Sequence, residues 1–243
     1  MSSMPERPLS PELAARLLRE LRESEGLRHR RVQGAEPDAA FVLVRQWQSE
    51  RLSRTYADLL VSPRYGPACR FFLADMYAPR DFTQRDHDIQ RVYEYLTRFL
   101  PQGMLRTLAA AIEANVLTQQ LDRSLAGVLA GRLDVTDTIS VAQYVEGYRL
   151  CDNYAARVRQ IELMVEIGTD IDGIVKIPLA GMTLRAARGP AHHAGWFQLQ
   201  DFLERGYHAF KNMHGAAYFL ETIAGREQAI LDRIYERHPD PFG

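Results

Sequence analysis

The chain is poor in cysteine, and its two cysteines do not form a Cys-x-x-Cys pair. Cys69 and Cys151 therefore indicate neither a disulfide framework nor a cysteine-rich zinc site, and they favour a reducing, cytoplasmic location. The sequence also lacks a run of 18 consecutive apolar residues, and residues 1–8 lack the apolar core of a signal peptide. We therefore expect neither export nor a membrane span.

An excess of charge of either sign is missing as well, because 30 basic and 31 acidic residues give a formal net charge of −1. This balance provides no positive field of the kind that attracts nucleic acid. The phosphate-binding P-loop, the Gly-x-Gly-x-x-Gly fingerprint and the Gly-x-Ser-x-Gly elbow of serine hydrolases are also absent. The sequence thus predicts no nucleic-acid partner and no cofactor, and it does not define an oligomeric state.

The hydrophobic residues make up 46% of the 243 residues, which is enough to bury a sizeable core. They recur mainly at spacings of three and four, and alternation with a period of two is rare, which is typical of helices. We predict an all-α, single-domain helical bundle of about eight to ten helices. Residues 1–37 are expected to form an N-terminal helix and a linker, and residues 38–243 the main helical domain.

Prolines, glycines and capping residues set the predicted helix boundaries. In the first half of the chain they predict helices at residues 10–26, 38–62, 67–77, 83–100, 104–117 and 118–131. In the second half, residues 140–177 are expected to form one long helix, or two helices that meet near Gly168. Because residues 158–175 are apolar around most of the helix, this helix is expected to be central and buried. A short helix to Arg188, a loop from Gly189, two C-terminal helices and a frayed tail from His238 complete the prediction.

The most unusual segment spans residues 70–93, where three phenylalanines, two tyrosines, four arginines and four aspartates occur within 24 residues. Arginine forks can pair with each aspartate, so one interpretation is an ion-pair network that stabilises a turn at Pro79. The other is a surface that binds a protein partner or a small anionic ligand. The candidate binding residues are Asp75, Tyr77, Arg80, Asp81, Arg85, Asp86 and Asp88.

Carboxylates on the predicted central helix form a second candidate site. Three of them recur at four-residue spacing and share one edge of the helix: Glu162, Glu166 and Asp170. Carboxylate-bridged di-metal proteins place such groups inside a bundle, normally with a Glu-x-x-His step that is absent here. The alternative prediction is therefore a metal-dependent enzyme, whose ligands are Glu162, Glu166, Glu204 and His208. In the competing interpretation these carboxylates face solvent or pair with Arg157 and Arg159.

Three function hypotheses follow. The first is a binding or regulatory module that uses residues 70–93. The second is the metal-dependent enzyme, and the third is a helical protein with an apolar cavity, lined by Phe and Met, for a lipid or isoprenoid. The residue pattern does not decide whether the protein is an enzyme.

The runs Phe71–Tyr77, Pro79–Phe82 and Arg85–Val92, together with the later Phe202–Gly206, resemble an uncharacterised group of proteobacterial proteins of the FFLEE-motif type. In this chain Ala74 and Asp75 occupy the positions where the motif name has two glutamates. The resemblance implies a bacterial cytoplasmic protein, and it assigns no activity and no catalytic residue.

Overall fold

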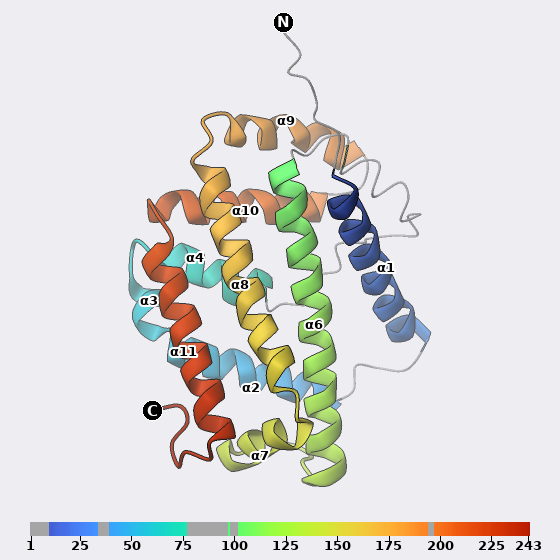
Figure 1. The fold of residues 1–243 in the computed structure, drawn as a ribbon, viewed down its shortest axis with the longest axis vertical. Helices are drawn as coiled ribbons and strands as arrows, with labels where there is room; N and C mark the ends of the chain where they lie inside the picture. Colours follow the sequence, from blue (N-terminus) through green and yellow to red (C-terminus); the bar gives the residue numbers. More distant parts are fainter. Residues whose placement is uncertain (1–9, 34–38, 77–96, 98–101, 194–196) are drawn as a thin grey trace, which may run out of the picture.

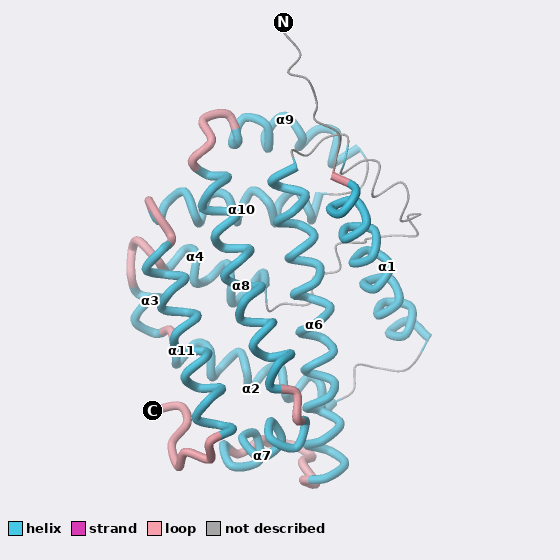
Figure 2. The backbone as a smooth tube through the Cα atoms, viewed as in Figure 1, coloured by secondary structure: helices cyan, strands magenta, loops and turns pink. Residues whose placement is uncertain are grey.

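The computed structural model describes residues 10–33, 39–76, 97, 102–193 and 197–243. Within these residues the chain forms ten α-helices and one π-helical turn, and no strand is present among them (Figures 1 and 2). The all-α prediction is therefore confirmed. No helix in the described part of the chain combines the length and the apolar composition needed to cross a bilayer.

Two long helices form the centre of the bundle: α6 (Gln102–Arg132) and α8 (Tyr154–Val175). They lie side by side through the middle of the molecule (Figure 1). The prediction of two helices at residues 104–117 and 118–131 is wrong, since α6 is continuous. No proline or glycine interrupts the join, and the Thr118 hydroxyl accepts a hydrogen bond from Gln160 Nε2 of α8 at 2.7 Å.

The helix predicted over residues 140–177 is divided, but at a different point from the predicted one. Helix α7 (Val141–Cys151) begins with a capping box, in which Ser140 Oγ accepts from the Gln143 N–H at 3.2 Å. The chain then turns at Asp152, whose φ of 48° is left-handed, and α8 begins. Gly168 lies within the continuous α8, so the expected joint at Gly168 is wrong.

Shorter helices surround one end of the central pair. Helix α2 (Ala39–Thr55) packs against α6, α11 (Ala217–Tyr235) packs against α8, and α7 contacts both α6 and α11. The predicted helix over residues 38–62 is interrupted at Tyr56, where α3 (Ala57–Val61) begins. After α11 the chain folds back and the Phe242 ring packs against Trp47, with 5.7 Å between ring centroids. The tail is therefore packed in place, which corrects the expectation of a frayed end.

The other end of the central pair is covered by three elements. Helix α1 (Pro11–Gln33) packs on α6 through the buried Leu17 and Leu21, and it continues well beyond the predicted end at Gly26. Helix α9 (Ala180–His193) packs on α10 (Phe197–Met213). The loop expected from Gly189 is wrong, since Gly189 and Pro190 are part of α9.

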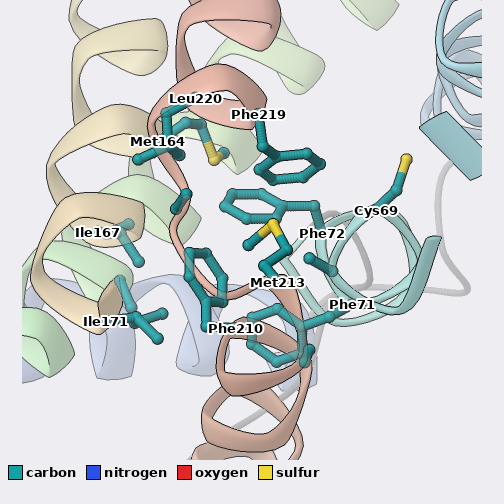
Figure 3. Packing of buried hydrophobic residues seen from close by; sticks show 14 of the residues in the cluster. Cys69, Phe71, Phe72, Met164, Ile167, Ile171, Phe210, Met213, Phe219 and Leu220 are labelled. Carbon is teal, nitrogen blue, oxygen red and sulfur yellow. The ribbon is translucent and has the colours of Figure 1, made fainter. Parts of the chain in front are cut away.

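A cluster of aromatic rings joins α10 and α11 to the start of the unusual segment. Helix α4 (Gly66–Phe71) leads directly into a π-helical turn, η1 (Phe72–Met76). The Phe72 ring lies 5.6 Å from Phe219 and 6.0 Å from Phe210, centroid to centroid (Figure 3). Phe71 packs on α10, at 5.2 Å from Phe202. The two phenylalanines of the segment are thus core residues.

Gly168 allows α8 and α11 to approach closely. A methyl group added there would lie 2.3 Å from Leu220 Cδ2, whereas one added at Gly173 of the same helix would meet nothing within 4 Å. We expect Gly168→Ala to lower the free energy of unfolding by about 1–3 kcal/mol, because overpacking forces Leu220 out of its position. Chemical denaturation measures this difference.

The matched control is Gly173→Ala, which restricts the unfolded chain without a new contact. We expect it to raise the free energy of unfolding by about 0.5 kcal/mol. Equal effects of the two substitutions would contradict close packing at Gly168.

Candidate functional site

A cavity of about 60 Å³ lies between α2, α4, η1, α7, α8 and α11. Its lining combines polar side chains from α2, α7, α8 and α11 with apolar side chains from α2, α8, α11 and η1. The polar lining residues are Gln48, Arg51, Tyr56, Tyr144, Tyr148, Arg157, Gln160 and Glu227. Polar groups that converge on a concave, mainly apolar space are the usual mark of a ligand site.

Arg51 and Glu227 form a buried ion pair in this wall. Arg51 Nη1 lies 2.5 Å from Glu227 Oε1, and the Tyr56 hydroxyl donates to the same oxygen at 2.8 Å. Burial alone lowers the pKa of Arg51, but the negative charge of Glu227 more than offsets this, so the pKa lies well above its ordinary value. The pair is charged on both sides and contributes no net charge to the cavity.

Arg157 is buried without a carboxylate partner. Its guanidinium carbon lies 4.3 Å from the Tyr148 ring centroid, and its two Nη atoms reach only the Gln160 side chain and the Leu121 carbonyl, each at 3.4 Å. Among the described residues no carboxylate lies within ion-pair distance of Arg157. The pKa of Arg157 is nevertheless raised, because the tyrosines and Asp122 outweigh the effect of burial. The guanidinium thus contacts only neutral groups directly among the described residues, while Asp122 acts on it without forming an ion pair.

Two nitrogen atoms in the wall have unused hydrogen-bonding capacity. The Nε atoms of Arg51 and Arg157 are both buried, and neither donates to an acceptor among the residues that the structure describes. A buried donor without an acceptor costs about 1–3 kcal/mol, more when it is charged. Because proteins rarely leave such groups unpaired, these donors indicate a ligand or ordered water in the cavity.

Asp122 of α6 lies behind Arg157 and does not neutralise it fully. It is 2% exposed, and its Oδ1 accepts no hydrogen bond from the protein. Burial raises the pKa of Asp122, and the positive charge of Arg157 acts in the opposite direction. A carboxyl whose charged form is disfavoured in this way is a weak counter-ion for a guanidinium.

Aromatic rings close the cavity on the side of α7. Tyr144 stacks on Trp47 with 3.6 Å between centroids, and the Phe242 ring lies 6.2 Å from Tyr144. Gln48 Nε2 donates to the Tyr144 hydroxyl at 3.4 Å. Cys69 also lines the cavity, but burial raises the pKa of its thiol to about 11, so it stays protonated and is a poor nucleophile.

Most of the predicted binding residues in the segment 70–93 lie outside the described residues: Tyr77, Arg80, Asp81, Arg85, Asp86 and Asp88. Asp75 falls within the π-helical turn. The role of these residues as a binding surface or an ion-pair network stays a prediction. The segment does contribute to the new site, since Phe72 and Leu73 line the cavity.

The predicted metal ligands are engaged by arginines. Glu162 lies 3.5 Å from Arg159 Nη1, and Glu166 pairs with Arg16 Nη1 of α1 at 3.1 Å. Glu204 accepts from Arg188 Nε at 3.0 Å, and His208 is exposed. Within the described ranges no group of three or more His, Cys, Asp and Glu side chains is arranged to hold a metal ion. Arg159 pairs as the competing interpretation expects, whereas Arg157 does not.

A second, smaller cavity of about 40 Å³ lies between α4, α6, α8, α9 and α10. Its wall is almost entirely apolar, with Phe71, Met104, Ile171 and Phe202 among its residues. A cavity needs roughly 10–15 Å³ for each water-sized probe, so this one has room for only a few non-hydrogen atoms. The lipid or isoprenoid hypothesis stays a prediction.

Four polar lining residues were not predicted from the sequence as site residues: Arg51, Glu227, Tyr144 and Tyr148. One signal was present: Val44, Gln48 and Arg51 follow the buried stripe of α2, so polar residues occupy positions where helical periodicity calls for apolar ones. A polar residue inside an apolar stripe must find a buried partner. The identity of that partner depends on which helix lies opposite, and this is a tertiary property.

The described residues form a helical bundle with a cavity lined in part by two arginines, Arg51 and Arg157. A family model described as a domain of unknown function, DUF8198, matches residues 27–241, and the chain therefore belongs to this family. The match covers every helix that lines the cavity and omits most of α1. Neither the curated proteins nor the solved structures gave a match to the chain.

Removal of Glu227 would leave Arg51 as an unpaired buried charge. We expect Glu227→Gln to lower the free energy of unfolding by about 3 kcal/mol, which is typical when one partner of a buried pair is lost. The double variant Arg51→Met with Glu227→Met removes both charges and is expected to recover at least half of this loss. Denaturant unfolding of the single and double variants provides the measurement.

Glu221→Gln is the control for this substitution, since Glu221 is an exposed residue of the same helix. It is expected to change the free energy of unfolding by less than about 0.5 kcal/mol. The buried-pair interpretation fails if Glu227→Gln is equally mild.

Proposed function

We propose that this protein binds a small anionic ligand in the cavity between α2, α7, α8 and α11, and that it acts as a binding or regulatory module. The observation that carries the proposal is the buried guanidinium of Arg157, which has no carboxylate partner among the described residues and keeps an unused Nε donor. An anion in the cavity supplies the missing countercharge and acceptor together.

The energetics support this assignment. Leaving a buried charge without its partner costs about 3–5 kcal/mol, so an anion that pairs with Arg157 recovers a large part of this cost. Charge-assisted hydrogen bonds are about twice as strong as neutral ones. Gln160 and Tyr148 hold the guanidinium in place before the ligand arrives, which reduces the entropy lost on binding.

The segment 70–93 belongs to the same proposal through its first residues. Phe72 and Leu73 form part of the apolar wall, so an occupied cavity contacts the segment directly. Binding of a ligand would therefore change the contacts of Phe72 and Leu73 directly. The two free cysteines and the resemblance to the proteobacterial group support a bacterial cytoplasmic location within this proposal.

Replacement of the unpaired arginine tests the proposal. Acetate, butyrate, phosphate and sulfate are added to the native protein at constant ionic strength, and the melting temperature and the heat of binding are recorded. At least one of these anions is expected to raise the melting temperature by several degrees, because it binds only the folded state. Arg157→Met is expected to lower the affinity for that anion at least tenfold.

Arg159→Met is the matched control. Arg159 lies two residues further along α8 but pairs with Glu113 on the other side of the helix, at 2.9 Å. We expect this variant to bind the anion as the native protein does. The proposal is overturned if none of the anions binds, or if both variants lose binding to the same extent.

A further inference from the structure

The charges around the cavity define how much negative charge it accepts. Arg51 and Glu227 neutralise each other across 2.5 Å, and Tyr56 adds a second hydrogen bond to the carboxylate. Arg157 is the other cationic group among the described lining residues, and the remaining polar lining groups are amides and hydroxyls. No described carboxylate forms an ion pair with Arg157, although Asp122 acts on it electrostatically. The wall therefore favours a monoanion over a ligand with two negative charges. Phosphate carries about 1.5 negative charges on average at neutral pH and sulfate carries two, so each brings more negative charge than one guanidinium neutralises into a buried space.

The apolar lining residues define what is attached to the anionic group. Leu52, Phe72, Leu73, Met164 and Ile223 line the cavity from α2, η1, α8 and α11. These side chains offer no hydrogen bond to the far end of a ligand. An inorganic oxyanion has acceptor oxygen atoms on all sides and would leave some of them unpaired against this surface. A ligand with a charged end and an apolar end satisfies both parts of the wall.

The volume limits the length of the apolar part. A cavity of about 60 Å³ holds roughly four to six water-sized spheres at 10–15 Å³ each. This is the size of a carboxylate that carries a short alkyl chain. A fatty acid chain would have to extend beyond this volume.

We propose that the ligand is a short-chain monocarboxylate, with its carboxylate against Arg157 and its alkyl end against Phe72, Leu73 and Met164. The inference rests on the proposed function, because it specifies the ligand class of the same cavity. In this arrangement Arg157 is the charge partner, Arg51 adds its Nε donor, and Gln160 is a positioning residue fixed by Thr118.

A chain-length series measures this preference in the native protein. Acetate, propionate, butyrate, hexanoate and octanoate are titrated calorimetrically at pH 7 and constant ionic strength, with phosphate and sulfate alongside. Each methylene that enters the apolar part is expected to raise the affinity about fourfold, up to propionate or butyrate. Octanoate, phosphate and sulfate are expected to bind at least tenfold more weakly than the best short carboxylate. Saturation-transfer NMR should show the alkyl protons in contact with the protein.

A change in the apolar wall provides a second test. Leu73 is half-buried, so Leu73→Ala enlarges the cavity with little risk to folding, and the preferred chain should lengthen by one or two carbons. Leu60→Ala is the matched control, because Leu60 is half-buried in α3 and does not line the cavity. This control is expected to leave the preferred length unchanged.

The outcomes separate this inference from the proposed function. If phosphate or sulfate binds at least as tightly as every carboxylate, and Arg157→Met abolishes that binding, the anion site stands and the carboxylate inference is overturned. If affinity is independent of chain length in both the native protein and Leu73→Ala, the assigned apolar end is wrong. If no anion in the series binds at all, the proposed function fails and the inference fails with it.

Discussion

The contact between α6 and α8 is the interaction on which the rest of the structure depends. In the middle of α6 the side chains that face α8 are small, with Ala110, Ala111 and Ala114 all buried, so the two helices approach closely. Leu163 and Ile167 of α8 fill the space beside them. Towards the other end the same interface becomes polar, where Gln160 bonds Thr118 and Arg157 reaches the Leu121 carbonyl. The cavity is thus located where the apolar part of the central interface ends.

Arginine serves two separate purposes in this protein. Near the surface it joins helices, as in the Arg226–Asp58 fork at 2.7 Å, which lowers the pKa of Asp58 to about 2. Such exposed pairs contribute little stability individually, typically under about 1 kcal/mol, because solvent screens them. Arg51 and Arg157 instead occupy buried positions, where a charge is costly and its partner matters greatly. The guanidinium suits both settings, since it stays protonated and stacks on aromatic faces such as that of Tyr148.

The sequence predicted those features that depend on local periodicity. The two C-terminal helices, with their apolar stripes around Phe210 and Phe219, follow directly from residue spacing. The prediction failed where tertiary contacts override a local signal. In the sequence Gly168 resembles a helix break. In the structure the absence of a side chain at Gly168 makes room for Leu220. The break that the structure shows, at Asp152, contains neither proline nor glycine. It is stabilised by the Tyr235 hydroxyl, which accepts a hydrogen bond from the Asn153 N–H and donates one to the Tyr148 carbonyl, both at 3.2 Å.

The candidate site was harder to predict for a related reason. The density of charged and aromatic residues in the segment 70–93 directed attention there, and two of those residues do line the cavity. The buried arginines carry a weaker signal: Arg51 follows the buried stripe of α2, but the sequence does not show which side chain faces Arg51 or Arg159 after folding. Whether a guanidinium is neutralised depends on helices that are distant in the sequence. Glu227 lies 176 residues after Arg51, and no spacing rule connects them.

The packed tail has a consequence for which parts of the chain the cavity depends on. Its wall combines Gln48 of α2 with Phe242, which follows α11. The Phe242 ring lies 5.7 Å from Trp47 and 6.2 Å from Tyr144, centroid to centroid. The wall therefore joins segments that are far apart in the sequence, and a change in the residues after α11 would alter the surroundings of rings on α2 and α7.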